Sequence, residues 1–217
     1  MIITWYGQSF FEIIIKPQKN SQIRVVIDPF SEEIGLRVPK LEADILLITH
    51  SHSDHNNFKI IKGEPFLISN PGEYEIKDVF IQGIFSYHDA KEGKERGFNT
   101  IYTIEGEEIK ICHLGDFGQK ELTSEQLEKI GEVDILMIPI GGVYTISATE
   151  AIDVMSQIEP KIIIPMHYSL PKLKIKLDGL DKFLRALGIK DIQPLSKLNI
   201  KKKDIGQDEA KIVVLEP

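Results

Sequence analysis

The stretch 46-LLITHSHSDHNN-57 decides how this chain folds and what it can do. Directly after an apolar run it places four potential metal ligands: His50, His52, Asp54 and His55. A solvated surface loop is the plain alternative, but three of the chain's six histidines fall in this one segment. Imidazole and carboxylate groups at this spacing are typical of a metal site, so the sequence predicts part of one here.

The composition is that of a globular protein long enough to bury a core: 217 residues, 42% of them hydrophobic and 27% charged. The single cysteine, Cys112, excludes a disulfide framework and a cysteine zinc knot, and it fits the reduced cytoplasm, where we expect the protein. The N-terminal residues lack the basic and apolar regions of a signal peptide, and no apolar run approaches the roughly 18 residues of a membrane span. We therefore expect no membrane partner.

The net charge of −7 is unevenly distributed. Residues 171–203 hold ten Lys and Arg against three Asp and Glu, a local charge of +7, whereas the rest holds 16 against 30, a local charge of −14. An acidic surface disfavours non-specific binding of nucleic acid, so we expect no nucleic-acid partner. In the basic segment, Lys172, Lys174 and Lys176 alternate with apolar residues, as in an exposed edge strand. The same lysines could instead form an anion-binding collar after His167.

The N-terminal half is rich in β-branched and aromatic residues, and turn signals divide it into short segments. These segments predict strands at 2–6, 10–15, 23–27, 45–48, 66–68, 79–85, 100–104 and 109–112. Short apolar segments in the C-terminal half predict further strands, covered on both faces, at 134–140, 161–165 and 211–215.

Three helices have start signals among those later strands. The segments that begin at Thr123 and Ser147 each carry the pattern of a capping box, and Asp178 is expected to cap a third helix that ends at Gly188. No linker rich in Pro, Gly or Ser divides the chain. We therefore expect one domain, 1–217, of the α/β class, in which two β-rich halves pack face to face with helices outside.

Candidate ligands follow four of the predicted strands at their ends: His50, His88, Asp116 and His167. Because a layered sheet brings the ends of its strands to one edge, we expect these side chains to lie together. Imidazole and carboxylate ligands without a thiolate suit Zn²⁺, and also Mn²⁺ or Fe.

The spacing within the first motif indicates a pair of ions. His50 and His52 are two positions apart, so in an extended segment they can face the same ion. Asp54 and His55 lie past the next turn and can face a second ion, and a carboxylate such as Asp116 can bridge two cations. Two ions about 3.5–4 Å apart can share a hydroxide that is nucleophilic at neutral pH.

These motifs together resemble a known family. HSHSDH at 50–55 fits the HxHxDH signature of the metallo-β-lactamase superfamily, and further motifs follow the superfamily's order: IDP (27–29), SYHDA (86–90), RGFNT (96–100), HLGD (113–116), IPIGGVYTI (138–146) and IPMHY (164–168). They most resemble the bacterial and archaeal metal-dependent hydrolases related to ascorbate-6-phosphate lactonase. The resemblance implies a four-layer αββα sandwich, with two mixed sheets face to face and helices outside.

The resemblance also implies a set of ligands for two divalent ions, Zn²⁺ in the first place and Mn²⁺ or Fe as alternatives. His50, His52 and His88 would hold the first ion, and Asp54, His55 and His167 would hold the second. Asp116 would be shared by both ions. Asp28 is expected behind them, where it would orient a ligand. His113 competes with His88 for the first ion, and could instead contact a ligand carboxylate or the substrate.

The implied reaction is hydrolysis of a small ester, lactone or phosphoester, which could be anionic. In it a hydroxide shared by the two ions attacks carbon or phosphorus, Asp54 moves its proton, and His113 or a tyrosine assists the leaving group. Two other functions stay open: a nuclease or phosphodiesterase acting on nucleic acid, and a metal-binding module without catalysis. The sequence does not indicate an oligomeric state.

Four further residues have both a structural and a functional interpretation. Arg96 and Asn99 are expected to order their loop, or else to bind substrate. Tyr144 and Tyr168 are expected to cap the core, or else to flank the mouth of the site.

Overall fold

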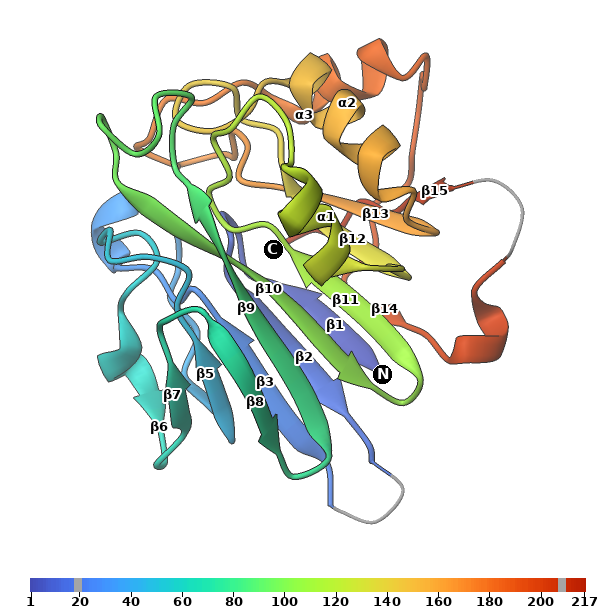
Figure 1. Ribbon diagram of the computed structural model, residues 1–217. Helices are drawn as coiled ribbons and strands as arrows, with labels where there is room; N and C mark the ends of the chain where they lie inside the picture. Colours follow the sequence, from blue (N-terminus) through green and yellow to red (C-terminus); the bar gives the residue numbers. More distant parts are fainter. Residues whose placement is uncertain (18–20, 207–209) are drawn as a thin grey trace.

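Two mixed β-sheets lie face to face in the computed structural model, which describes residues 1–17, 21–206 and 210–217 (Figure 1). The first sheet has the order β14-β1-β2-β3-β5-β7, with strands β1 (Ile2–Trp5), β2 (Phe11–Ile15), β3 (Ile23–Ile27), β5 (Ile45–Leu47), β7 (Phe66–Ile68) and β14 (Leu198–Asn199). The second has the order β15-β13-β12-β11-β10-β9-β8, with strands β8 (Gly72–Ile76), β9 (Val79–Tyr87), β10 (Phe98–Gly106), β11 (Ile109–His113), β12 (Ile135–Pro139), β13 (Ile162–Met166) and β15 (Lys211–Ile212).

Alternation along the strands of the first sheet creates two cores. On β3, Val25 and Ile27 belong to the main core, whereas Val26 belongs to a smaller core on the other face. The buried Tyr102 of β10 joins the sheets, because its hydroxyl lies 3.0 Å from the carbonyl oxygen of Ile48 and 3.3 Å from that of Ile68. Burial on both faces explains why these strands are apolar almost throughout.

Three α-helices are grouped over the C-terminal strands of the second sheet: α1 (Ser124–Ile130), α2 (Ala148–Ile158) and α3 (Leu180–Ala186) (Figure 1). The capping boxes predicted at Thr123 and Ser147 are confirmed. The predicted cap of the third helix is wrong. Gly179 precedes α3 without a side-chain cap, and the Asp178 carboxylate accepts a hydrogen bond from Lys182 Nζ at 2.8 Å instead.

The outer layer on the first sheet consists of short elements. The 3₁₀ helices η1 (Glu32–Ile34) and η2 (Phe58–Ile60) pack on the smaller core, beside the strand pair β4 (Leu41–Glu42) and β6 (Ile61–Lys62). The sandwich of two sheets with helices outside is therefore confirmed, with a thinner layer on this side. A third 3₁₀ helix, η3 (Lys202–Asp204), precedes β15.

In two segments the strands of the structure differ from those predicted from the sequence. Residues 172–176 form no strand, although lysines and apolar residues alternate there. Instead the Lys174 N–H donates to the Ile34 carbonyl of η1 at 2.8 Å, while Leu173 and Ile175 pack on the smaller core. Conversely, β8 (Gly72–Ile76) lies between the predicted strands 66–68 and 79–85, where the sequence predicted no strand.

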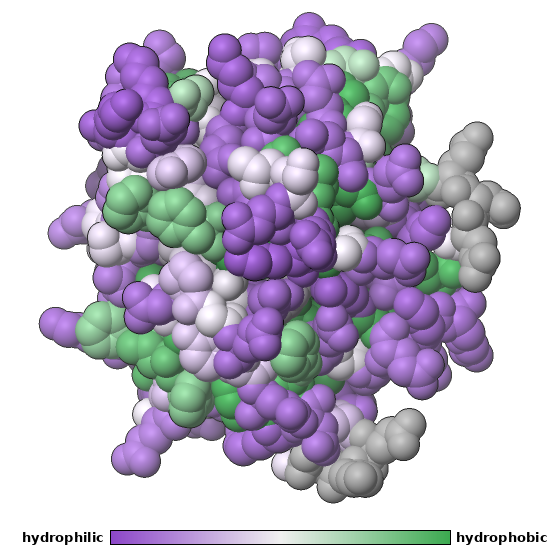
Figure 2. All heavy atoms as spheres, in the orientation of Figure 1, coloured by the Kyte–Doolittle hydropathy of each residue, from purple (hydrophilic) through white to green (hydrophobic). Residues whose placement is uncertain are grey.

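The surface is mostly hydrophilic on the face in Figure 2, where hydrophobic side chains gather only in scattered patches. Within the described residues the longest helix, α2, has 11 residues. That is too short to cross a bilayer, which needs about 20, and none of the described helices is long and apolar enough to do so.

Candidate metal centre

The candidate ligands meet where strands of both sheets end. His50 comes after β5, His88 directly after β9, and His167 directly after β13. Asp116 lies three residues past the end of β11. The edge predicted from the sequence is thus the place where the two sheets bring these side chains together.

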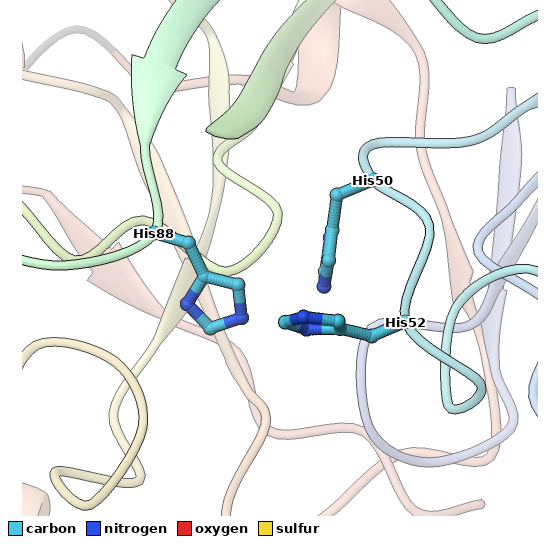
Figure 3. A group of neighbouring side chains, drawn as sticks. All are labelled: His50, His52 and His88. Carbon is cyan, nitrogen blue, oxygen red and sulfur yellow. The ribbon is translucent and has the colours of Figure 1, made fainter. Parts of the chain in front are cut away.

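The first group consists of His50, His52 and His88, with one ring nitrogen of each within 4.8 Å of the others. Figure 3 shows the rings of His50 and His52, on the loop after β5, turned toward the ring of His88 across the site. The packing behind His88 leaves no room for a side chain, since a Cβ at Gly118 would collide with the His88 carbonyl.

The second group consists of Asp54, His55, Asp116 and His167, again with ligand atoms within 4.8 Å of one another. His167 has a left-handed backbone, with φ of 50°, and its N–H donates to the Gln8 carbonyl at 3.1 Å. The turn after β1 therefore holds the backbone of His167 in this conformation.

Asp116 joins the two groups. Its Oδ2 lies 3.2 Å from His55 Nε2, 3.3 Å from His88 Nε2 and 3.2 Å from His167 Nε2. Ligand atoms that share a tetrahedral Zn²⁺ at roughly 2.1 Å lie about 3.4 Å apart. The distances from Asp116 Oδ2 to the three Nε2 atoms are therefore those expected between ligand atoms that bind the same cation.

Hydrogen bonds behind the site fix two histidine tautomers. The Thr49 hydroxyl donates its one hydrogen to Asp28 Oδ2 at 2.7 Å. Its contact with His50 Nδ1 at 2.9 Å must therefore be a hydrogen bond in which His50 Nδ1–H is the donor. His55 Nδ1 donates to the same Asp28 oxygen at 2.9 Å, as predicted for a residue that orients a ligand. In His50 the Nε2 lone pair is thereby left to face the site, and in His55 Nε2 is the nitrogen that would face a cation.

Several of these nitrogens are buried without a hydrogen-bond partner among the described residues: Nε2 of His50, Nδ1 of His88, and both ring nitrogens of His167. Unpaired buried polar atoms are costly and rare in folded proteins. Their convergence with two carboxylates indicates that the donor set fits divalent cations.

The electrostatics of the site also suit cations. Burial lowers the pKa of His50 well below its ordinary value of 6.5 and also lowers the pKa of His167, so both rings are neutral at pH 7. Burial also acts to lower the pKa of His55, but the carboxylates of Asp116 and Asp28 outweigh it and raise that pKa well above 6.5. Without metal, His55 therefore keeps a proton that a cation must displace.

His113 lies outside both groups. Its Nε2 lies 3.0 Å from the Ser9 carbonyl and its Nδ1 accepts from the Gly115 N–H at 3.1 Å, so both nitrogens of this fully buried ring are in use. The structure accordingly places His88, not His113, beside His50 and His52. It also gives no support to a direct part for His113 in the reaction.

Sequence reasoning missed two residues that hold the site. Ser9 Oγ donates to Asp116 Oδ1 at 3.3 Å, and both residues are buried. The Asp89 carboxylate, next to His88, accepts hydrogen bonds from four backbone N–H groups of the loop 91–96. An aspartate that opens a turn was the available signal for Asp89, whereas a lone serine gives none.

Asn99 and Tyr168 have structural positions. The Asn99 side chain donates to the Leu114 carbonyl and accepts from the Asp116 N–H at 3.0 Å, so it has a loop-ordering role, but in the loop after β11 and not in its own. Tyr168 is buried, with its ring 5.1 Å from that of Trp5.

A cavity of about 330 Å³ opens over the ligands. It is lined by five of them and three other residues: His52, Asp54, His88, Asp116 and His167, with Arg96, Tyr144 and Ile175. The volume is at the lower end for small-molecule sites. None of the three lysines at 172, 174 and 176 lines it.

Asp28→Asn is expected to weaken metal binding about 10- to 100-fold, because the neutral amide holds His55 less firmly and offers one acceptor fewer. The left-handed backbone of Asp28, with φ of 49°, tolerates Asn, so the fold should survive. Competition with a chromophoric chelator measures the change. Asp44→Asn is the matched control, since the Asp44 carboxylate bonds Arg24 N and Lys77 Nζ away from the site. Equal affinities in the two variants would contradict the role given to Asp28.

Comparison with known proteins agrees with this geometry. Residues 2–167 match the family model of the beta-lactamase superfamily domain. A relative from Staphylothermus marinus, named UPF0173 metal-dependent hydrolase, is 31% identical over 199 residues, which cover 77% of this chain and 83% of the relative. One of the same name from Thermococcus onnurineus is 29% identical over 197 residues, covering 77% and 84%.

Solved structures show the same fold. A proposed Zn-dependent hydrolase of the metallo-beta-lactamase superfamily from Thermotoga maritima superposes with a TM-score of 0.78 at 32% identity, covering 99% of this chain and 98% of that one. An isothiocyanate hydrolase from Delia radicum gut bacteria superposes with a TM-score of 0.66 at 12% identity, covering 93% and 99%, which shows the fold alone.

Proposed function

We propose that this chain, which belongs to the metallo-beta-lactamase superfamily and is a metal-dependent hydrolase, holds two divalent cations and hydrolyses a small ester, lactone or phosphoester. The observation that carries the proposal is the position of Asp116 Oδ2 among three histidine Nε2 atoms of two ligand groups. The nitrogen and oxygen donor set favours Zn²⁺, with Mn²⁺ or Fe as alternatives.

In this proposal each ligand group holds one ion. His50, His52 and His88 would hold the first, and Asp54, His55 and His167 would hold the second. Asp116, which lies with the second group and 3.3 Å from His88 Nε2 of the first, would be shared. When bound, such a pair of cations lowers the pKa of water toward neutrality and polarises a carbonyl or phosphoryl oxygen.

Asp54 is the residue that we propose moves the proton. Its side chain is 19% exposed, lines the cavity and lies 3.6 Å from His55 Nε2. Burial acts to raise the pKa of Asp54, but His55 and His167 outweigh it and lower that pKa below the ordinary 3.8. The carboxylate is thus ionised at neutral pH, so it can accept a hydrogen bond from the attacking water and pass on a proton.

The cavity supports a small substrate. Its volume of about 330 Å³ suits a molecule with a few carbon atoms around the scissile bond. The net charge of −7 counts against nucleic acid as substrate. The single, fully buried Cys112 thiol favours the reducing cytoplasm as the place of action.

A substrate panel tests the proposal. Protein loaded with Zn²⁺, Mn²⁺ or Fe²⁺ is expected to hydrolyse at least one of a set of neutral and anionic esters, lactones and phosphodiesters. His52→Ala should reduce that turnover roughly 10³-fold, because metal catalysis supplies several kcal/mol of transition-state stabilisation. His52 is exposed, so the variant should keep its fold, and Lys59→Ala, on η2, is the control.

Full turnover in metal-verified His52→Ala would contradict the ligand assignment. Turnover of phosphodiesters alone, with an affinity for RNA that falls steeply with salt, would favour a nuclease. Metal binding without turnover of any substrate would favour a binding module.

A further inference from the structure

We infer that Arg96 is a recognition site for a carboxylate or phosphate group that the substrate carries apart from its scissile bond. The inference rests on the proposed hydrolase function and narrows the substrate to small anionic esters or lactones. Arg96 lines the same cavity as His52, Asp54 and His88, and among its described lining residues it is the one Lys or Arg.

The loop that carries Arg96 is ordered without its guanidinium group. The Asp89 carboxylate accepts from the backbone N–H groups of Glu95 and Arg96, at 3.0 and 2.8 Å. The loop then closes on the metal centre, because His88 N–H donates to the Gly97 carbonyl at 3.1 Å. The main chain of Arg96 thus sets the loop, which leaves its side chain available to a ligand.

The guanidinium group is held in place but weakly paired. Its central carbon lies 5.1 Å from the centroid of the Tyr144 ring, a cation–π contact that restricts the side chain without using its N–H donors. Its ion-pair contact within the described part of the chain is with Glu95, at 4.0 Å. The side chain is 32% exposed, so its forked donors can still bind a planar carboxylate or a phosphate in two places.

The other walls of the cavity agree with an anionic substrate. Two divalent cations outweigh the two ligand carboxylates, Asp54 and Asp116, so a metal-loaded floor is positive, and Arg96 adds to that charge at the side. The lysines at 172–176, which the sequence offered as an anion collar, are not at the cavity, where Ile175 supplies an apolar wall. The structure thus moves the anion site from the lysines to Arg96.

The test measures binding to metal-loaded protein by calorimetry. The probes are dicarboxylates from malonate to adipate, each compared with the monocarboxylate of the same length. One carboxylate of a dicarboxylate can lie at the metal centre and the other at Arg96. Wild type should therefore bind one length of dicarboxylate better than its partner. 3-Phosphonopropionate, as a further arm, tests whether a phosphonate can replace one of the two carboxylates.

Arg96→Gln should reduce the affinity for the preferred dicarboxylate roughly 10- to 100-fold and leave the monocarboxylate affinity and the metal content unchanged. Arg96→Lys should lose less. Arg185→Gln is the matched control, because Arg185 lies on α3 and pairs with Asp181. Tyr144→Leu should also weaken dicarboxylate binding, whereas Tyr144→Phe should not, since Phe keeps the aromatic face that positions Arg96.

Wild-type protein that does not distinguish the two probe series would overturn the inference. So would Arg96→Gln that binds dicarboxylates like Arg185→Gln, or that loses affinity for both series equally. The metal content is measured before any probe is added. Wild-type protein that binds no metal would indicate failure of the proposed function, whereas metal-loaded protein with one of the outcomes above would indicate failure of the inference about Arg96.

Discussion

Removal of bound metal is expected to abolish hydrolysis and to lower the midpoint of thermal unfolding by roughly 5–15 °C. A single ion that binds only the folded chain, at 100 to 1,000 times its dissociation constant, stabilises it by about 3–4 kcal/mol, so the loss of one tightly bound ion already accounts for this shift. For a chain of 217 residues, each kcal/mol corresponds to about 2–4 °C. The buried nitrogens of His50 and His167 that lack a hydrogen-bond partner among the described residues are the physical reason, because a cation can satisfy them.

Differential scanning calorimetry before and after chelation measures the shift, with elemental analysis to show that the metal is gone. Re-addition of Zn²⁺ should restore both the midpoint and the activity. Uptake should also release protons at pH 7, because the pKa of His55 is raised well above 6.5 in the metal-free chain. Metal affinity should therefore increase with pH. An unchanged midpoint after complete removal would contradict a structural role for the metal.

The sequence predicted the part of the site that is local or that follows from strand ends. The motif at 50–55 is visible because its ligands are neighbours along the chain. His88, Asp116 and His167 are visible because each follows an apolar strand, and a sheet brings such ends together.

What the sequence could not decide depends on the direction of side chains. His88 and His113 both stand at a strand end, but His113 is the last residue of β11 and its ring is held by Ser9 and Gly115. Ser9 supports Asp116 from 107 positions away, and no pattern of residue spacing predicts such a contact.

Similar limits apply to the fold. The capping boxes that begin at Thr123 and Ser147 were predicted because their hydrogen bonds lie within one helical turn. The strand predicted at 172–176 did not form because a strand needs a partner. Here one backbone hydrogen bond to Ile34 and partial burial of Leu173 and Ile175 take its place. Alternation records which side chains are buried, and in this segment a packed loop buries them equally well.

Asp116→Asn is expected to have the largest effect of any single substitution. The shape of the side chain is kept, and Oδ1 can still accept from Ser9 Oγ. The charge beside His55, His88 and His167 is lost, and with it the oxygen that both ions share in the proposed site. The variant should bind at most one ion per chain, and hydrolysis should fall roughly 10³-fold or more.

The same variant also lowers the stability of the metal-free protein, and this second effect separates two roles for Asp116. Burial acts to raise the pKa of Asp116, but His167 and His55 outweigh it and hold that pKa well below 3.8. The carboxylate therefore stabilises the fold at pH values above its unfolded-state pKa for as long as His55 keeps its proton. Its loss should destabilise the metal-free chain by up to about 3–5 kcal/mol, less to the extent that His55 releases its proton. Urea unfolding measures this loss of stability. Asp134→Asn is the control, because that carboxylate bonds Lys110 N and Lys202 Nζ at the other end of the sheet.

If Asp116→Asn kept two ions and full turnover, the shared-ligand geometry would have to be abandoned. If it lost stability but kept both ions, Asp116 would be a structural counter-charge for His55 and no more.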